Sequence, residues 1–224
     1  MAFLNITTED QHIRFSCGGS ILSRDTIISA AHCFSSYTVG PLSSVDAVVG
    51  VSDIFSHSAS VHSVSQIKIH ENFSSSTLEN DIAILTLAAP LTFNAYVQPV
   101  CLGTDAMIFP KRKIETMGWG FDGSEGDMPD KLQHVTLDIY NPETCKNVYS
   151  EYVQDKNFCT LTPGKDACIG DSGGPMVVEK ENKWYQLGII SFGEGCAAPD
   201  KPNVAASIPY FKSWIFDNMV KIQC

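Results

Sequence analysis

The sequence predicts an all-β protein, and two observations support this. Most of its 224 residues fall into short apolar runs separated by turn residues, and many short strands at such spacing are typical of a barrel or a sandwich. Helical periodicity is clear at the C-terminus alone. No apolar run approaches the roughly 20 residues needed to cross a bilayer. Strand-like runs cover residues 1–4, 20–28, 82–87, 175–178 and 186–192.

The elements follow from local patterns. The run from Met1 has the pattern of a strand rather than of an export signal. A polar stretch at residues 179–183 lies between two strand-like runs and predicts a hairpin loop. After Pro209, apolar residues recur at helical spacing, which predicts a closing helix packed on the core. These residues are Phe211, Trp214, Ile215, Met219 and Ile222.

Composition limits the functional classes. A hydrophobic fraction of 44% indicates a compact globular protein, and the net charge of −10 argues against a nucleic-acid partner, which needs a basic face. Eight cysteines in a chain of this size indicate an oxidising, extracellular compartment. No C-x-x-C pair or His/Cys cluster at ligand spacing occurs, so we expect no metal. Glycosylation sequons begin at Asn5 and Asn72 and fit secretion.

Three motifs carry chemistry. The run Gly-Asp-Ser-Gly-Gly-Pro at residues 170–175 places Ser172 on a tight turn, although these residue types also form ordinary turns. His32 lies in Ala-Ala-His-Cys, and Asp81 lies in Asn-Asp-Ile-Ala-Ile-Leu. The chain order His, Asp, Ser is one of the known orders of a base, a residue that orients it, and a nucleophile.

With these motifs, the chain resembles the trypsin-like (chymotrypsin-fold) serine endopeptidases over nearly its whole length. The resemblance implies two six-stranded antiparallel β-barrels with the active site in the cleft between them. We expect the N-terminal barrel at residues 1–103, the C-terminal barrel at 104–208 and the closing helix at 209–224. It implies no cofactor. The calcium loop of some relatives corresponds to residues 51–60, which offer only the carboxylate of Asp53.

The resemblance also implies catalytic roles. His32 takes the Ser172 proton and returns it to the leaving amine, and Asp81 fixes the His32 tautomer. Ser191 supports Asp81 from beneath. The backbone N–H groups of Gly170 and Ser172 form the oxyanion hole.

For the specificity pocket, the resemblance implies a floor at Asp166, which favours cleavage after Arg or Lys. The rest of the pocket is expected at Ala167, Ser191, Phe192, Gly193 and Asn203. Three positions depart from the family pattern: Asn203 replaces a glycine, Ala205 replaces a tyrosine and Phe192 replaces a tryptophan. If Asn203 fills the pocket and bonds to Asp166, the preference changes to small, polar or apolar side chains.

Three disulfides are implied by the resemblance: Cys17–Cys33, Cys145–Cys159 and Cys168–Cys196. Two further cysteines have open assignments. The cysteine at the position of Cys101 joins an upstream segment in many two-chain relatives, and Cys224 joins either Cys101 or a partner chain.

Activation in this family inserts a newly cut N-terminal Ile or Val ammonium beside the acid before the serine, here Asp171. The sequence begins within what resembles the first strand, without the Ile-Val-Gly-Gly start. We therefore expect Met1 to be an internal residue of a longer chain, and weak, zymogen-like activity if the upstream piece is absent.

These inferences predict a secreted serine endopeptidase that acts on protein substrates. Long loops expected at residues 5–16 and 34–48, the tether at Cys101 and the unusual pocket favour limited proteolysis in a cascade such as clotting, complement or innate immunity. A serpin-type or other protein inhibitor is a further expected partner, whereas nucleic acid and membrane are not. The alternatives are a digestive enzyme and a non-catalytic homologue that acts as a binding module.

Overall fold

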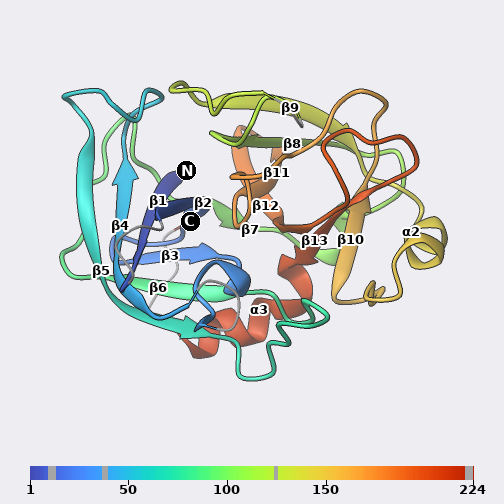
Figure 1. Ribbon diagram of the computed structural model, residues 1–224, viewed down its shortest axis with the longest axis horizontal. Helices are drawn as coiled ribbons and strands as arrows, with labels where there is room; N and C mark the ends of the chain where they lie inside the picture. Colours follow the sequence, from blue (N-terminus) through green and yellow to red (C-terminus); the bar gives the residue numbers. More distant parts are fainter. Residues whose placement is uncertain (10–13, 37–39, 124–125, 220–223) are drawn as a thin grey trace.

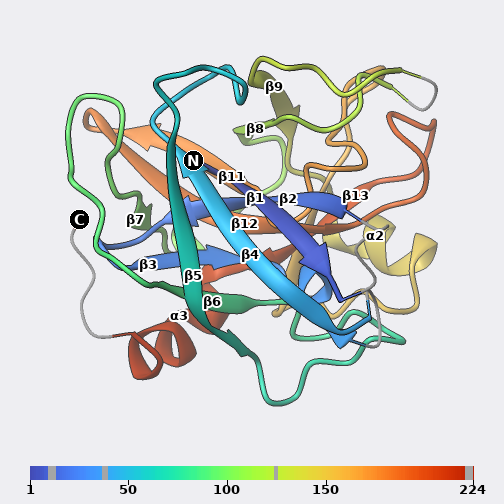
Figure 2. The same ribbon diagram turned by 60° about the vertical axis from the view of Figure 1, so that its left-hand side comes forward.

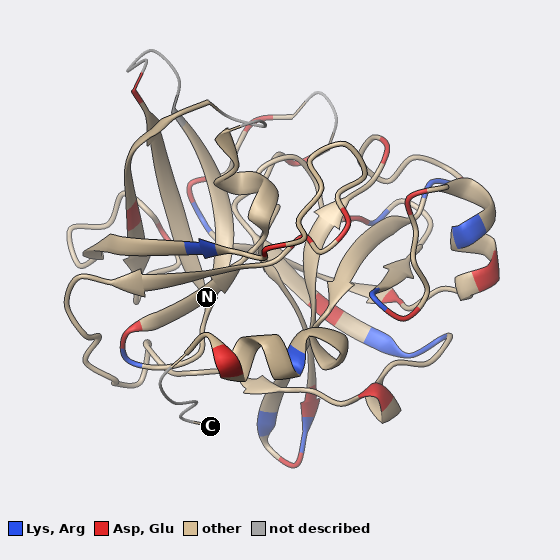
Figure 3. Ribbon diagram, turned by 90° about the horizontal axis from the view of Figure 1, so that it is seen from below, with Lys and Arg blue, Asp and Glu red and all other residues tan. Residues whose placement is uncertain are grey.

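Two β-structures lie side by side, with helices at their margins (Figure 1). The computed structural model describes residues 1–9, 14–36, 40–123, 126–219 and 224. No helix within these ranges is both long and apolar enough to cross a membrane. Acidic residues are distributed over loops and strand ends around the molecule (Figure 3).

The N-terminal strands close into a six-stranded antiparallel barrel in the order β1-β2-β3-β6-β5-β4. In β1, every second residue is buried, so Ala2, Leu4 and Ile6 face the barrel core, as strand periodicity requires. A short 3₁₀ turn, η1 (Ala31–Cys33), follows β3. The strands are β1 (Ala2–Thr8), β2 (Arg14–Ile21), β3 (Thr26–Ser29), β4 (Leu42–Val49), β5 (Ser60–Ile69) and β6 (Ala83–Leu87).

The C-terminal strands form a second sheet in the order β10-β13-β12-β11-β8-β9, with β7 paired to β12. An isolated bridge between Ile139 and Thr160 brings the two ends of this path together, which gives the sheet its barrel form. The two barrels confirm the predicted fold class. The strands are β7 (Cys101–Leu102), β8 (Lys113–Gly118), β9 (Gln133–Asp138), β10 (Asn157–Thr160), β11 (Pro175–Lys180), β12 (Lys183–Phe192) and β13 (Asn203–Ser207).

The closing helix is present as α3 (Ile208–Asp217), which ends before the predicted residue 224; residues 220–223 lie outside the described residues. Its buried side chains Ile208, Phe211 and Ile215 join the core of the N-terminal barrel, although the helix follows the last strand of the second sheet. Figure 2 shows α3 beneath β6. The helix therefore links the two halves. Shorter segments are η2 (Asp105–Met107) and α2 (Pro142–Val148), whose first turn is capped by the Asn141 side chain.

Some predicted boundaries were wrong. The run at residues 20–28 is two strands, because the chain turns between Ile21 and Thr26. Leu22 N donates to Thr26 O (2.9 Å) and Ser23 Oγ to Asp25 Oδ1 (2.6 Å) in this turn. The loop expected at residues 5–16 is mostly the β1–β2 hairpin, and that at 34–48 includes most of β4. Residues 10–13 and 37–39, in the middle of these two loops, lie outside the described residues.

Candidate active site

His32 and Asp81 come from neighbouring parts of the N-terminal barrel. His32 lies in the 3₁₀ turn after β3, and Asp81 lies just before β6, the strand that pairs with β3. His32 Nδ1 and Asp81 Oδ2 are 2.7 Å apart, and the His32 backbone N–H donates to Asp81 Oδ1 at 2.8 Å. Both carboxylate oxygens thus contact one histidine. This double contact fixes the ring and places the Nδ1 proton toward Asp81, which leaves Nε2 as the acceptor.

Ser191 contributes the third contact to this carboxylate. At the end of β12 in the second sheet, its Oγ donates to Asp81 Oδ2 at 2.6 Å. Asp81 is 1% exposed, and three hydrogen bonds compensate its burial. Burial lowers the pKa of His32, but the charge and hydrogen bond of Asp81 outweigh it, so the pKa lies above its ordinary value.

Ser172 lies on a turn that is held by glycine on both sides. Gly170 has φ +96° and Gly173 has φ +78°, in the left-handed region that side chains rarely adopt. A Cβ on Gly173 would lie 2.2 Å from Ser29 Oγ. The Ser172 carbonyl accepts from Gly18 N of β2 at 2.7 Å, so the serine is held directly against the N-terminal barrel.

Some backbone N–H groups in this turn have hydrogen-bond acceptors and others do not. Asp171 N donates to Cys168 O, Gly173 N to Ile190 O and Gly174 N to Asp171 O. Among the described residues, no acceptor takes the N–H of Gly170 or of Ser172, which are the two expected oxyanion donors. No hydrogen bond joins Ser172 Oγ to His32 Nε2 either, which is common in serine hydrolases without substrate.

Asp171 is held by a feature that the sequence analysis missed. Its two oxygens accept from Gly120 N and Cys168 N, both at 2.8 Å. Gly118 and Gly120 make this possible, since a Cβ on either would lie within 2.6 Å of Asp171 Oδ1. The Gly-Trp-Gly spacing at residues 118–120 was the signal available. Burial raises the pKa of Asp171. Asp171 takes part in none of the ion pairs among the described residues.

Asp166, the expected pocket floor, is satisfied by backbone amides. Oδ1 accepts from its neighbour Ala167 N (2.9 Å) and Oδ2 from Ala197 N (3.1 Å). No described cation pairs with it, including the adjacent Lys165. Burial raises its pKa to about 6. Asp166 is therefore a carboxylate that no positively charged side chain of the described residues neutralises.

Asn203 stands beside Gly193 rather than on Asp166. Its Nδ2 lies 3.3 Å from the position that a Gly193 Cβ would take. Asn203 is 6% exposed and its Oδ1 has no hydrogen-bond partner. The alternative in which this amide bonds to Asp166 is not observed, since Asp166 accepts from backbone amides instead. Phe192, another departure from the family pattern, packs edge-on against Tyr149 with ring centroids 5.5 Å apart.

Four disulfides use all eight cysteines: Cys17–Cys33, Cys145–Cys159, Cys168–Cys196 and Cys101–Cys224. The first three are the pairs that the resemblance implied. The last corrects the expectation that Cys101 tethers an upstream chain: Cys101 is bonded to Cys224, the alternative partner within this chain.

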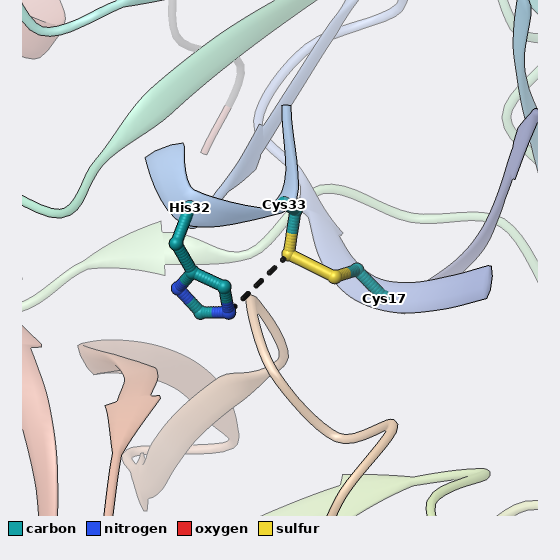
Figure 4. Close-up of side chains that lie close together, drawn as sticks. All are labelled: Cys17, His32 and Cys33. Atoms are coloured by element: carbon teal, nitrogen blue, oxygen red, sulfur yellow. Dashed lines mark hydrogen bonds between the residues drawn. A yellow bond between two sulfur atoms is a disulfide. The ribbon is translucent and has the colours of Figure 1, made fainter. Parts of the chain in front are cut away.

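The Cys17–Cys33 bridge lies against the catalytic histidine candidate, and Figure 4 shows His32 Nε2 directed toward it. Cys33 Sγ is 3.8 Å from Nε2 and 4.0 Å from the Ser172 carbonyl oxygen. Ligand atoms of Cys17, His32 and Cys33 lie within 4.8 Å of one another, as in a metal site. However, the two sulfurs are bonded to each other and so are not thiolate ligands.

The two sequons differ in setting. Asn72 is exposed in the turn between β5 and β6. Asn5 is half-buried in β1, opposite Ser16 of β2 and Asp46 of β4.

Comparison with known proteins agrees with this arrangement. The family model described as Trypsin matches residues 1–215. The chain is 36% identical to Trypsin-1 of Astacus astacus over 209 residues, which is 91% of the chain and 88% of that protein. It is 34% and 33% identical to Transmembrane protease serine 11G of Mus musculus and of Rattus norvegicus, over 89% of the chain in both cases.

The chain spans about half the length (48%) of the two transmembrane protease relatives. Its match to the family model extends over both barrels and includes the segments that carry His32, Asp81 and Ser172. The chain therefore belongs to the trypsin family of serine proteases.

Proposed function

We propose that this protein is an active serine endopeptidase with the triad His32, Asp81 and Ser172. The observation that carries the proposal is the pairing of a fully engaged Asp81–His32 couple with two unused N–H groups beside Ser172. Gly170 and Ser172 are half-buried, so their N–H groups are accessible to a substrate oxygen.

The mechanism follows from the geometry. His32 Nε2 takes the Ser172 hydroxyl proton as Oγ bonds to the substrate carbonyl carbon, while the carbonyl oxygen becomes an oxyanion held by Gly170 N–H and Ser172 N–H. The imidazolium that forms is stabilised by Asp81, 2.7 Å from Nδ1. It then gives its proton to the amine that leaves, and the acyl-enzyme is hydrolysed by water in the same manner.

For specificity, we propose Asp166 as the partner of an Arg or Lys side chain of the substrate. Its carboxylate lacks a cation within the described chain, and an ammonium or guanidinium group would supply one. Asn203 opposes this preference, because its amide occupies the space beside Gly193. Asp171 is proposed to pair with an activating amino terminus, and its raised pKa fits a carboxylate that lacks a counter-charge.

The setting that we propose is extracellular limited proteolysis in a zymogen cascade, with a protein inhibitor as a further partner. Four disulfides fit an oxidising compartment, and the exposed Asn72 is the more accessible of the two proposed glycan acceptors. A digestive role is the alternative within the same chemistry. The non-catalytic alternative is supported by one observation, Asn203 beside Gly193.

The test is turnover of a peptide library by the activated protein and by Ser172→Ala. The account predicts cleavage by the wild type and loss of turnover, with unchanged thermal stability, in the variant. Ser75→Ala, at an exposed loop serine, is the matched control and should cleave normally. Normal activity in Ser172→Ala would refute the mechanism, and an inert wild type would favour a binding module.

A further inference from the structure

One ion pair joins the two barrels close to the candidate active site. Lys156, which directly precedes β10 of the C-terminal barrel, pairs with Glu79, two residues before Asp81 in the N-terminal barrel. The other ion pairs between described residues each lie within one barrel. In Figure 1, the loop that carries Glu79, between β5 and β6, extends below α3 toward β10. The pair therefore connects the barrel that contains Asp81 with the barrel that contains Ser172.

The turn around Glu79 has a constrained backbone. Leu78 and Asn80, on either side of it, have φ of +53° and +57°, in the left-handed region. A residue with a side chain, leucine above all, adopts this region only where its surroundings hold it there. The N-terminal barrel supplies part of this restraint, because Asn80 Nδ2 donates to Asn72 O (2.7 Å) and Ser74 N donates to Glu79 O (3.1 Å). The ion pair of the Glu79 side chain adds a restraint from the C-terminal barrel.

Lys156 is itself held by several contacts. Its carbonyl accepts from Ser207 N at 2.8 Å, and its N–H donates to Val153 O at 3.0 Å. Its Nζ lies 5.8 Å from the centroid of the Tyr210 ring in α3, a cation–π distance. The Lys156 side chain is 21% exposed and that of Glu79 is 38% exposed, so water screens this pair less than a fully exposed one. A lysine fixed in this way restrains the position of Glu79 in addition to neutralising its charge.

The position of the Asp81 carboxylate determines that of His32. Asp81 accepts from the backbone N–H of His32 and contacts its ring, and its third contact comes from Ser191 of the C-terminal barrel (2.6 Å). The C-terminal barrel thus acts on Asp81 in two ways, directly through Ser191 and along the chain through Glu79. An error of about 1 Å in the position of a catalytic group can reduce the rate about 10²-fold. A displaced turn would therefore slow proton transfer by His32.

We propose that Lys156 and Glu79 are positioning residues for catalysis, an inference that rests on the function proposed above. Their ion pair fixes the turn that carries Asp81. It thereby aligns His32 of the N-terminal barrel with Ser172 of the C-terminal barrel. Within the described part of the chain, neither side chain hydrogen-bonds to a triad residue, so the pair acts through the backbone. Its effect falls on the chemical steps and is expected in kcat rather than in KM.

Steady-state kinetics of the activated protein test the proposal. Lys156→Met removes the charge and keeps much of the side-chain volume, and we expect kcat to fall about tenfold while KM changes by less than about twofold. Lys156→Arg keeps the charge and should retain kcat within about twofold of the wild type. The exchanged pair, Glu79→Lys with Lys156→Glu, should recover most of the kcat that Glu79→Lys alone loses. Lys113→Met is the matched control and should leave kcat unchanged, because Lys113 pairs with Asp138 inside the C-terminal barrel.

A second measurement follows the histidine and does not depend on turnover. The proton on His32 Nδ1 lies in a short hydrogen bond to a charged carboxylate and should give a low-field NMR signal. This signal should move or broaden in Lys156→Met and keep its wild-type position in Lys156→Arg and in Lys113→Met. A merely structural role for the pair would lower Tm without changing this signal or the kcat of the folded protein.

The outcomes separate this proposal from the protease function. An unchanged kcat in Lys156→Met would overturn the positioning role and leave the protease function intact. A fall in kcat that Lys156→Arg shares, or that leaves the His32 signal unchanged, would overturn it as well. If the activated wild type cleaves no peptide, the proposed function itself fails, and the positioning role fails with it.

Discussion

Replacing Asp81 with asparagine changes one oxygen to an NH₂ group and leaves the shape of the side chain intact. Two orientations of the amide are available. If NH₂ takes the Oδ1 position, it faces the His32 backbone N–H at 2.8 Å, a donor against a donor. If NH₂ takes the Oδ2 position, it faces His32 Nδ1, which can accept, and Ser191 Oγ, which can rotate to accept.

The second orientation avoids the clash and is therefore favoured. It forces Nδ1 to be the acceptor and places the ring proton on Nε2, so His32 can no longer take the Ser172 proton. We expect kcat/KM to fall about 10⁴-fold, as is typical for this substitution in Ser-His-Asp triads. That factor corresponds to about 5 kcal/mol of transition-state stabilisation.

The loss of the carboxylate also changes the His32 titration. Burial lowers the pKa of His32, and in the wild type Asp81 more than reverses this effect. In Asp81→Asn, burial acts alone, so an NMR titration should find the pKa below its ordinary value of about 6.5 instead of above it. Steady-state kinetics and this titration together check the reasoning. A variant with near wild-type kcat/KM, or with an unchanged His32 pKa, would refute it.

Three further predictions concern other parts of the chain. Asn203→Gly should raise the ratio of cleavage after Arg to cleavage after small residues about tenfold, because it clears the space beside Gly193; an unchanged library profile would contradict this. The raised pKa of Asp166 makes its deprotonation unfavourable to the fold, so wild-type stability is lost as the pH rises from about 4 through about 6. The difference in Tm between Asp166→Asn and the wild type should therefore grow over this interval, and a constant difference would count against a buried Asp166. The double variant Cys101→Ser with Cys224→Ser should lower the free energy of unfolding by about 2–5 kcal/mol, since the bridge joins residues 123 apart; urea titration that finds no loss would show that the bridge contributes nothing.

Local patterns predicted what depends on local chemistry. The glycines around Ser172 mark a turn that only glycine permits, and the strands at β6, β11 and β12 were visible as apolar runs. The hairpin at residues 179–183 was predicted from its polarity, and Glu181 and Asn182 there have positive φ, as tight hairpins require.

Features that depend on tertiary contact were not predicted. Gly118 and Gly120 make room for Asp171, yet they lie more than 50 residues before it. The side chains of Phe55, Phe121 and Ile169 come from three loops to line one groove, and no periodicity in the sequence connects them. The strand break within residues 20–28 is a turn closed by the backbone bond from Leu22 N to Thr26 O and by the Ser23–Asp25 side-chain contact, which an apolar pattern does not reveal.

The most direct test of the account is covalent labelling by an organophosphonate, a reagent that needs an activated serine beside an oxyanion hole. Intact-mass and peptide mapping of the activated protein should find a single adduct, on Ser172, and no adduct in His32→Ala. An unlabelled wild-type protein, or equal labelling after removal of His32, would contradict the claim that these residues form a catalytic triad.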